Sequence, residues 1–256
     1  MKHGFLDKYS ELNSFVHRLD PRTKILAILA FVLAVMATPP LRWEAFALYL
    51  ALILSLVLLA RLPIRYVLKK SLVVIPFVLM VAAFIPFLET GEAGSYNVWF
   101  WKASITRSGL VILWNMLVKA WLSALSMALL SSTTRFPELL KGLGRLGLPK
   151  VMVMMLSFMY RYIFVLADEA MRMGQAKESR SSGGGLAWQI KAVGNLIGTL
   201  FVRTYERAER VYGAMLARGF DGEIRTLSSL RFGRADLGFG VAYSLCLVAI
   251  CLAALR

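Results

Sequence analysis

Residues that carry redox, metal or nucleophilic chemistry are scarce in this chain. Among its 256 residues there are only two cysteines and two histidines. Cys246 and Cys251 lie five positions apart in one apolar run, a spacing that places them on different faces of a helix. His3 and His17 have no second ligand at a useful spacing. We therefore expect no disulfide, no metal site and no cofactor.

Sequence signatures of nucleotide hydrolysis and of intramembrane catalysis are also missing. No phosphate-binding loop of the pattern G-x-x-x-x-G-K-[ST] occurs, and the nearest run, residues 142–150, has the wrong spacing and a proline before its lysine. Neither H-E-x-x-H nor G-x-S-x-G is present, and no apolar run contains a close pair of carboxylates. The chain is therefore expected not to be an enzyme, and a proton-coupled carrier is disfavoured.

Acidic side chains are few relative to basic ones. Lysine and arginine number 30 against 15 aspartates and glutamates, which gives a formal net charge of +15. Such an excess can mark a nucleic-acid-binding protein, but 58% of the residues are hydrophobic and several apolar runs are long enough to cross a bilayer. In an integral membrane protein, basic residues gather in cytoplasmic loops. The sequence therefore predicts the lipid bilayer, and not nucleic acid, as a partner.

Five apolar runs are predicted to cross the bilayer. The first is short, and Pro39 and Pro40 end it. We interpret it as a membrane helix and not as a secretory signal, because the leader before it is long and carries Asp7, Glu11 and Asp20. The five runs cover residues 25–37, 45–60, 71–88, 110–130 and 237–255.

The distribution of cations decides the predicted orientation. Basic clusters precede the first run, separate the second from the third and follow the fourth, so the N-terminus is expected in the cytoplasm. The loops at residues 39–44 and 89–107 are then expected outside. Three segments follow: membrane helices in 1–131, cytoplasmic helices in 132–235 and a last membrane helix in 236–256. The second external loop carries an aromatic group that resembles an interfacial belt: Tyr96, Trp99, Phe100 and Trp101.

One further apolar run, residues 151–166, could be counted as another crossing. Arg161 argues against this, because a cation at the centre of a lipid-exposed helix costs ~2.5 to 3.5 kcal/mol on insertion scales. We expect the run to lie beneath the bilayer, buried against protein. A shorter amphipathic helix over residues 136–146, with Thr133 or Thr134 as its cap, is expected to lead into it.

Two long helical patterns, residues 151–180 and 186–218, dominate the cytoplasmic segment. At ~1.5 Å per residue each helix would reach about 45 Å, which is too long for the interior of a small domain. In the second pattern Glu206 lies at ion-pair spacing from both Arg203 and Arg210, and the cations avoid an apolar stripe. That helix is therefore predicted to be amphipathic and to lie in or beside water. The stripe consists of Ile190, Val193, Ile197, Leu200, Ala208, Val211 and Met215.

Each long helix is predicted to end in an arginine followed by small residues. The first ends at Arg180, before Ser181 and a serine- and glycine-rich stretch, and the second ends at Arg218, before Gly219. A cation at the negative end of a helix dipole is ordinary, so both arginines can simply finish their helices. Alternatively, each guanidinium offers a bidentate fork to a carboxylate on another protein, and two ends suit two copies of that partner.

Methionines give the first long helix a flexible, polarizable apolar surface. The methionines either pack in a core or hold a partner that moves or is exchanged; they are Met152, Met154, Met155 and Met159. Candidates for the partner contact are Met152, Met155 and Met159. Ile197 and Leu200 of the second helix are the other candidates for such a contact.

Three features carry a resemblance to a known family. They are the motif H-R-L-D-P-R-T-K at residues 17–24, the order of four apolar runs, cytoplasmic helices and a last apolar run, and A-R-G at residues 217–219. Over nearly its whole length the chain resembles the transmembrane T component of energy-coupling-factor transporters, most closely the cobalt-type branch. That family has an X-R-X motif at the end of each of two coupling helices, which insert into grooves on two ATP-binding-cassette subunits. Here the motifs would be Ser179, Arg180 and Ser181, which departs from the commoner Ala-Arg-Gly or Ala-Arg-Ser form, and Ala217, Arg218 and Gly219.

The resemblance implies an all-α, polytopic membrane protein with a cytoplasmic coupling domain of long amphipathic helices, in the cytoplasmic (inner) membrane of a bacterium. It implies a non-catalytic subunit that transmits the motions of two ATP-binding-cassette ATPases to a separate substrate-binding membrane subunit, the S component. Cobalt is the expected substrate, with nickel or a vitamin such as biotin as alternatives. Two other classes stay open: a conventional ABC permease that lines its own translocation path, and a membrane-embedded scaffold or enzyme.

Overall fold

The computed structural model describes residues 14–40, 42–82, 96–97, 104–105, 107–180, 183, 185–222 and 232–255. Its elements are helices, apart from one pair of two-residue strands. In chain order the elements are α1 (Phe15–Arg18), α2 (Pro21–Ala37), α3 (Trp43–Leu59), α4 (Ile64–Leu72), α5 (Ile75–Ala82), β1 (Tyr96–Asn97), β2 (Ser104–Ile105), α7 (Arg107–Thr133), α8 (Phe136–Arg145), α9 (Lys150–Arg180), α10 (Leu186–Ala217) and α11 (Arg234–Leu255).

The chain divides into two compact units. One, called the bundle unit below, holds residues 2–142 together with residues 230–256 and therefore contains the helices from α1 to α7 and α11. The other, called the hairpin unit, holds residues 143–229 and contains α9 and α10. Helix α8 begins in the bundle unit and ends in the hairpin unit.

The local sequence explains where α2 begins and ends. The Asp20 side chain caps the helix by accepting a hydrogen bond from the Arg22 backbone N at 3.0 Å. Pro21 occupies the first turn, where its missing N–H leaves no helical hydrogen bond unmade. At the other end Thr38 is extended, and its hydroxyl donates to the Ala34 carbonyl at 2.9 Å. Helix α2 therefore contains the whole of the first predicted apolar run.

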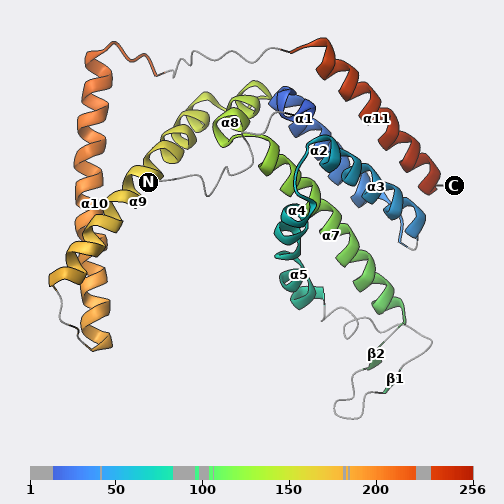
Figure 1. The fold of residues 1–256 in the computed structure, drawn as a ribbon, viewed down its shortest axis with the longest axis horizontal. Helices are drawn as coiled ribbons and strands as arrows, with labels where there is room; N and C mark the ends of the chain where they lie inside the picture. Colours follow the sequence, from blue (N-terminus) through green and yellow to red (C-terminus); the bar gives the residue numbers. More distant parts are fainter. Residues whose placement is uncertain are drawn as a thin grey trace. The chain divides into compact units, whose positions relative to one another are not determined.

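The core of the bundle unit forms around α7. This helix contacts α2, α3, α4 and α5, and α11 packs on α2 and α3 (Figure 1). Phe31 of α2 meets Tyr49 of α3 edge to face, with ring centroids 5.6 Å apart. Every fourth residue of α3 faces this core, because residues four apart share one side of a helix. These residues are Ala45, Tyr49, Ile53 and Val57.

Three described helices are long and apolar enough to cross a membrane, judged by length and composition. They are the segments Gly109–Thr133, Lys150–Arg180 and Arg234–Ala254, and Trp43–Leu59 is a shorter apolar helix. The prediction of an all-α, polytopic membrane protein is therefore confirmed. The pair of β1 with β2, antiparallel, lies within the predicted second external loop and leaves this class unchanged. Trp99, Phe100 and Trp101 lie outside the described residues.

The third predicted run, residues 71–88, is not one continuous helix over its described part. Helix α4 ends at Leu72, two residues form a turn, and α5 begins at Ile75. The cause is Pro76, which has no N–H to offer the Leu72 carbonyl and whose ring would collide with that carbonyl in a continuous helix. In the first turn of α5 the same proline is well tolerated. Residues 83–88 lie outside the described part.

Residues 151–166 are not buried against the other described helices of this chain, so the prediction of burial is wrong as far as the chain's own packing is concerned. No residue of α9 or α10 is buried. Val151, Met155, Met159 and Ile163 expose between 48 and 61% of their surface. The reason lies in the packing of the hairpin unit, because the α9 residues that line the grooves against α10 all come from Val165 onward. The first half of α9 therefore presents its apolar side outward.

The predicted caps of α8 are also wrong. Thr133 is the last residue of α7, and its hydroxyl donates to the Leu129 carbonyl at 2.9 Å. The Thr134 backbone N still donates to the Leu130 carbonyl at 3.0 Å. Both threonines are thus engaged by the end of α7, and Arg135 is the residue that precedes α8, its carbonyl accepting the first hydrogen bonds of that helix.

Candidate functional site

The C-terminal end of α9 presents an arginine to solvent. Helix α9 ends at Arg180, and both Ser179 and Arg180 are exposed. The Ser179 hydroxyl donates to the Ala176 carbonyl at 3.1 Å, so it is used within the helix. Gly183 has a φ of +98°, a conformation that favours glycine. Ser181 lies outside the described residues, so the structure describes two of the three positions of this predicted motif.

The C-terminal end of α10 is closed by a Schellman motif. Ala217 is the last residue of α10, and Arg218 is its C-cap. The Gly219 N–H donates to the Leu216 carbonyl at 3.0 Å, and the Phe220 N–H donates to the Met215 carbonyl at 3.1 Å. Gly219 has the positive φ, +78°, that this motif needs. The sequence Ala-Arg-Gly therefore fixes the end of the helix and leaves Arg218 exposed.

Helices α9 and α10 cross and run in broadly opposite directions, so the two arginine ends lie toward opposite ends of α10 (Figure 1). Arg180 lines the same groove as Ala192, near the start of α10, whereas Arg218 directly follows the last residue of α10. From Ala192 to Arg218, at ~1.5 Å per residue, α10 separates the two ends by about 40 Å. The hairpin unit therefore has room for one partner molecule at each arginine end.

An ion pair joins α9 to α10 between the two ends. Arg203 Nη1 of α10 lies 2.8 Å from Glu169 Oε1 of α9, and Arg172 Nη2 lies 3.3 Å from the other oxygen of the same carboxylate. The predicted pair of Arg203 with Glu206 is replaced by this contact, because Glu169 on the facing helix is the less exposed and better placed acceptor. The predicted pair of Glu206 with Arg210 is present at 3.9 Å.

Neither arginine end is neutralised within the part of the chain that the structure describes. The Arg180 and Arg218 side chains make no ion pair or hydrogen bond there, and both are exposed. A guanidinium without an internal partner keeps its five donors available for a carboxylate on another molecule.

The predicted apolar contact residues differ in how available they are. Met152, Met155 and Met159 lie at helical spacings of three and four on α9 and expose 49, 61 and 54% of their surface. Ile197 of α10 is 60% exposed. Leu200 is half-buried and lines the groove against α9. The three methionines and Ile197 are therefore free to contact a partner, and Leu200 much less so.

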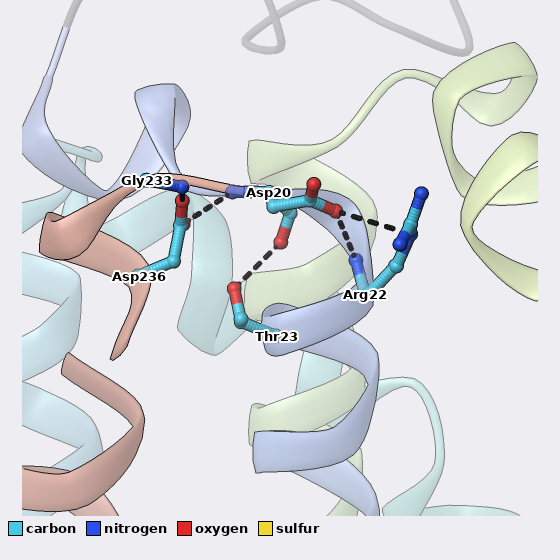
Figure 2. Close-up of polar contacts among 5 residues, drawn as sticks. All are labelled: Asp20, Arg22, Thr23, Gly233 and Asp236. Atoms are coloured by element: carbon cyan, nitrogen blue, oxygen red, sulfur yellow. Dashed lines mark hydrogen bonds and ion pairs between the residues drawn. The ribbon is translucent and has the colours of Figure 1, made fainter. Parts of the chain in front are cut away.

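A buried polar cluster joins the start of α2 to the start of α11 (Figure 2). Asp236 accepts a hydrogen bond from the Asp20 backbone N at 2.7 Å and, with its second oxygen, one from the Gly233 backbone N at 2.8 Å. The Thr23 hydroxyl donates to the Asp20 carbonyl at 2.7 Å. Sequence reasoning missed Asp236 because its partner lies 216 residues away. One feature of the sequence could have identified Asp236, because it is an acidic residue in the first turn of an apolar helix.

Lys24 extends this cluster to α1 and α7. Its Nζ donates to the carbonyls of His17 and Thr133, each at 3.1 Å. Burial lowers the pKa of Lys24 to about 8, although the charges of Glu138, Asp236 and Asp20 act in the opposite direction. The motif at residues 17–24 therefore holds the neighbouring ends of four helices together.

These observations define a polytopic helical membrane protein with an exposed hairpin of two amphipathic helices. No group of potential metal ligands occurs among the residues that the structure describes. The chain belongs to the cobalt transport protein family CbiQ, whose sequence model matches residues 12–228. The predicted relation to the T components of energy-coupling-factor transporters is confirmed by this match and by the relatives below.

Three relatives share one name and cover most of the chain. The energy-coupling factor transporter transmembrane protein EcfT of Heliobacterium modesticaldum is 33% identical over 269 residues, which is 98% of this chain and 98% of that protein. EcfT of Acidaminococcus fermentans is 33% identical over 248 residues, 90% of this chain and 89% of that protein. EcfT of Listeria innocua is 31% identical over 233 residues, 87% and 86% of the two chains. The chain is thus similar to transporter membrane subunits along its full length.

Proposed function

We propose that this chain couples ATP hydrolysis by two ATP-binding-cassette subunits to the movement of a separate substrate-binding membrane subunit. The observation that carries this proposal is the pair of exposed, unneutralised arginines, Arg180 and Arg218, about 40 Å apart on one helix pair. Each guanidinium binds a carboxylate in a groove of one ATPase subunit. Because the sequence has no phosphate-binding loop, nucleotide is hydrolysed by those partners.

The exposed apolar surface of the hairpin unit supports the second contact. Met152, Met155 and Met159 with Ile197 contact the S component, and their flexible side chains tolerate its movement. Leu200 contributes less surface because it is half-buried. When the ATPase dimer closes on ATP, α9 and α10 shift with it and move the S component.

The substrate and the orientation belong to the same proposal. Cobalt is the proposed substrate because the family description names cobalt transport, and nickel or a vitamin such as biotin are the alternatives. Specificity resides in the separate subunit. The chain lies in the inner membrane of a bacterium with its N-terminus and residues 132–235 in the cytoplasm, as the distribution of basic residues predicts.

Charge reversal at the arginine ends tests the coupling. Arg218→Glu and Arg180→Glu are each expected to weaken association with the ATPase subunits by at least about tenfold, since opposing like charges in a close contact costs more than about 1.4 kcal/mol. Cobalt uptake should fall in parallel, while the amount of protein in the membrane stays unchanged. Co-purification of the ATPase subunits and uptake of radioactive cobalt measure the two effects.

The matched control is Arg161→Glu, which makes the same charge change at an exposed position in the middle of α9. It should retain ATPase association. Normal ATPase association and uptake in Arg218→Glu would exclude the proposed role of the arginine end at Arg218. Equal losses in Arg161→Glu would show that the effect comes from the change in net charge alone.

A further inference from the structure

A groove between α9 and α10 lies between the two arginine ends and gathers cations from one face of α10. Arg203, Arg207 and Arg210 lie at helical spacings of four and three, and all three line a volume of about 180 Å³. One water needs only about 10 to 15 Å³ of such space, so the groove has room for a larger polar group. The apolar residues Val165, Leu166 and Leu200 complete its lining.

The carboxylates of the groove do not balance these cations. Glu169 is shared by Arg203 at 2.8 Å and by Arg172 at 3.3 Å. Glu206 lies 3.9 Å from Arg210. Arg207, which is half-buried, makes no ion pair or hydrogen bond with any residue that the structure describes. Three guanidinium groups therefore pair with two carboxylates, and Arg207, a partly desolvated cation, is left without a counter-charge.

The apolar surroundings indicate an amphiphilic ligand. On α9 the exposed apolar side that ends with Ile163 leads one turn further to Leu166, which lines the groove together with Val165 and Leu200. A helix pair with cations on one side and exposed apolar residues on another is typical of segments that lie at an anionic membrane surface. A soluble anion would use the cations but leave this apolar surface uncovered.

We propose that the groove binds the headgroup phosphate of an anionic phospholipid, with Arg207 as its principal ligand and Arg210 as the second. Guanidinium groups bind phosphate oxygens in a bidentate manner, and one phosphodiester supplies the missing negative charge. The acyl chains cover the neighbouring apolar residues. This lipid site is distinct from the arginine ends and does not depend on the proposed coupling to ATPases.

Native mass spectrometry of the full-length protein in detergent tests the site, with added phosphatidylglycerol and phosphatidylcholine as probes. The protein is expected to retain phosphatidylglycerol and to release phosphatidylcholine. Arg207→Gln should weaken retention of phosphatidylglycerol by at least about tenfold. Arg145→Gln, which removes one exposed cation of the hairpin unit outside the groove, should leave it unchanged. Arg207→Lys, which keeps the charge and the fold but loses the fork, should give an intermediate value.

Three results would overturn the lipid site. One is equal loss in Arg207→Gln and Arg145→Gln, which would reduce the effect to net charge. Another is release of phosphatidylglycerol by millimolar inorganic phosphate, which would assign the groove to a soluble phosphate. The third is loss of ATPase co-purification in Arg207→Gln with retention of phosphatidylglycerol, which would make the groove a protein contact. Because ATPase association and lipid retention are measured separately, failure of this site leaves the coupling proposal standing.

Discussion

Lys24 is a lysine buried at the start of α2, with only 4% of its surface exposed. Its ammonium group is held by the carbonyls of His17 and Thr133, and the nearby charges of Glu138, Asp236 and Asp20 only partly offset the cost of removing it from water. Its pKa is therefore lowered from 10.5 to about 8. A lysine with such a pKa links the stability of the bundle unit to pH.

The pH dependence of stability should reveal this lysine. Between pH 8 and 10.5 the unfolded chain holds a proton on Lys24 that the folded chain has released, so stability rises with pH over that range and is constant below it. The full rise is about 3 kcal/mol for a shift of this size. In Lys24→Met this component is absent. Thermal unfolding in detergent is measured at pH 7 and at pH 10 for the unchanged protein and for Lys24→Met. The difference between their two changes in stability is the contribution of Lys24, since all other titrating groups are common to both proteins. Parallel pH profiles would contradict the buried, titrating lysine.

Glycine has opposite roles in α8 and in α10. A Cβ atom placed on Gly142 would lie 3.1 Å from Ile25 Cδ1 and 3.2 Å from Pro21 Cβ, so this glycine lets α8 approach the start of α2 closely. A Cβ atom on Gly194 of α10 would meet nothing within 4 Å. The first glycine is required by packing, and the second only adds flexibility to a helix.

Substitution of these two glycines should therefore change stability in opposite directions. Gly142→Val is expected to destabilise the bundle unit by about 1 to 3 kcal/mol through overpacking against α2. Gly194→Ala is expected to stabilise α10 by about 0.5 to 1 kcal/mol, because alanine has the higher helix propensity. Melting temperatures in the same detergent compare both with the unchanged protein. A Gly142→Val protein that melts no lower than Gly194→Ala would show that α8 does not pack as closely as described.

Helix ends set by neighbouring residues could be predicted from the sequence, whereas contacts between distant segments could not. The glycine after Arg218 marked the end of α10, which the structure places at Ala217. Arg203 forms its ion pair with Glu169 on another helix and not with Glu206 on its own helix. Asp236 accepts a hydrogen bond from a backbone N–H that lies 216 residues away in the sequence. The break before Pro76 was visible in the sequence, but apolar character alone suggested one continuous run.

The order of the helices along the chain does not show which helices pack together in the bundle unit. Helix α11 comes last, yet it packs on α2 and α3, near the beginning of the chain. Residues 143–229 are thus inserted between two helices of one bundle, and the hydrogen bond from Asp20 to Asp236 joins the segments on either side of the insertion. Apolar runs and cation counts predicted the membrane class and a long segment outside the bilayer, but they contain no information on which run packs against which.

The orientation of the whole chain is the remaining prediction, and single cysteines test it. After Cys246 and Cys251 are replaced by serine, cysteines at Ser181 and Gly222, near the two arginine ends, should react with a membrane-impermeant maleimide only from the cytoplasmic side. A cysteine at the exposed Arg42, in the predicted first external loop, should react only from outside. Labelling is measured on intact cells and on inside-out vesicles. If Ser181→Cys were labelled in intact cells, α9 would cross the bilayer with Arg161 inside it, at a cost of ~2.5 to 3.5 kcal/mol, and the arginine end at Arg180 would be out of reach of any cytoplasmic ATPase.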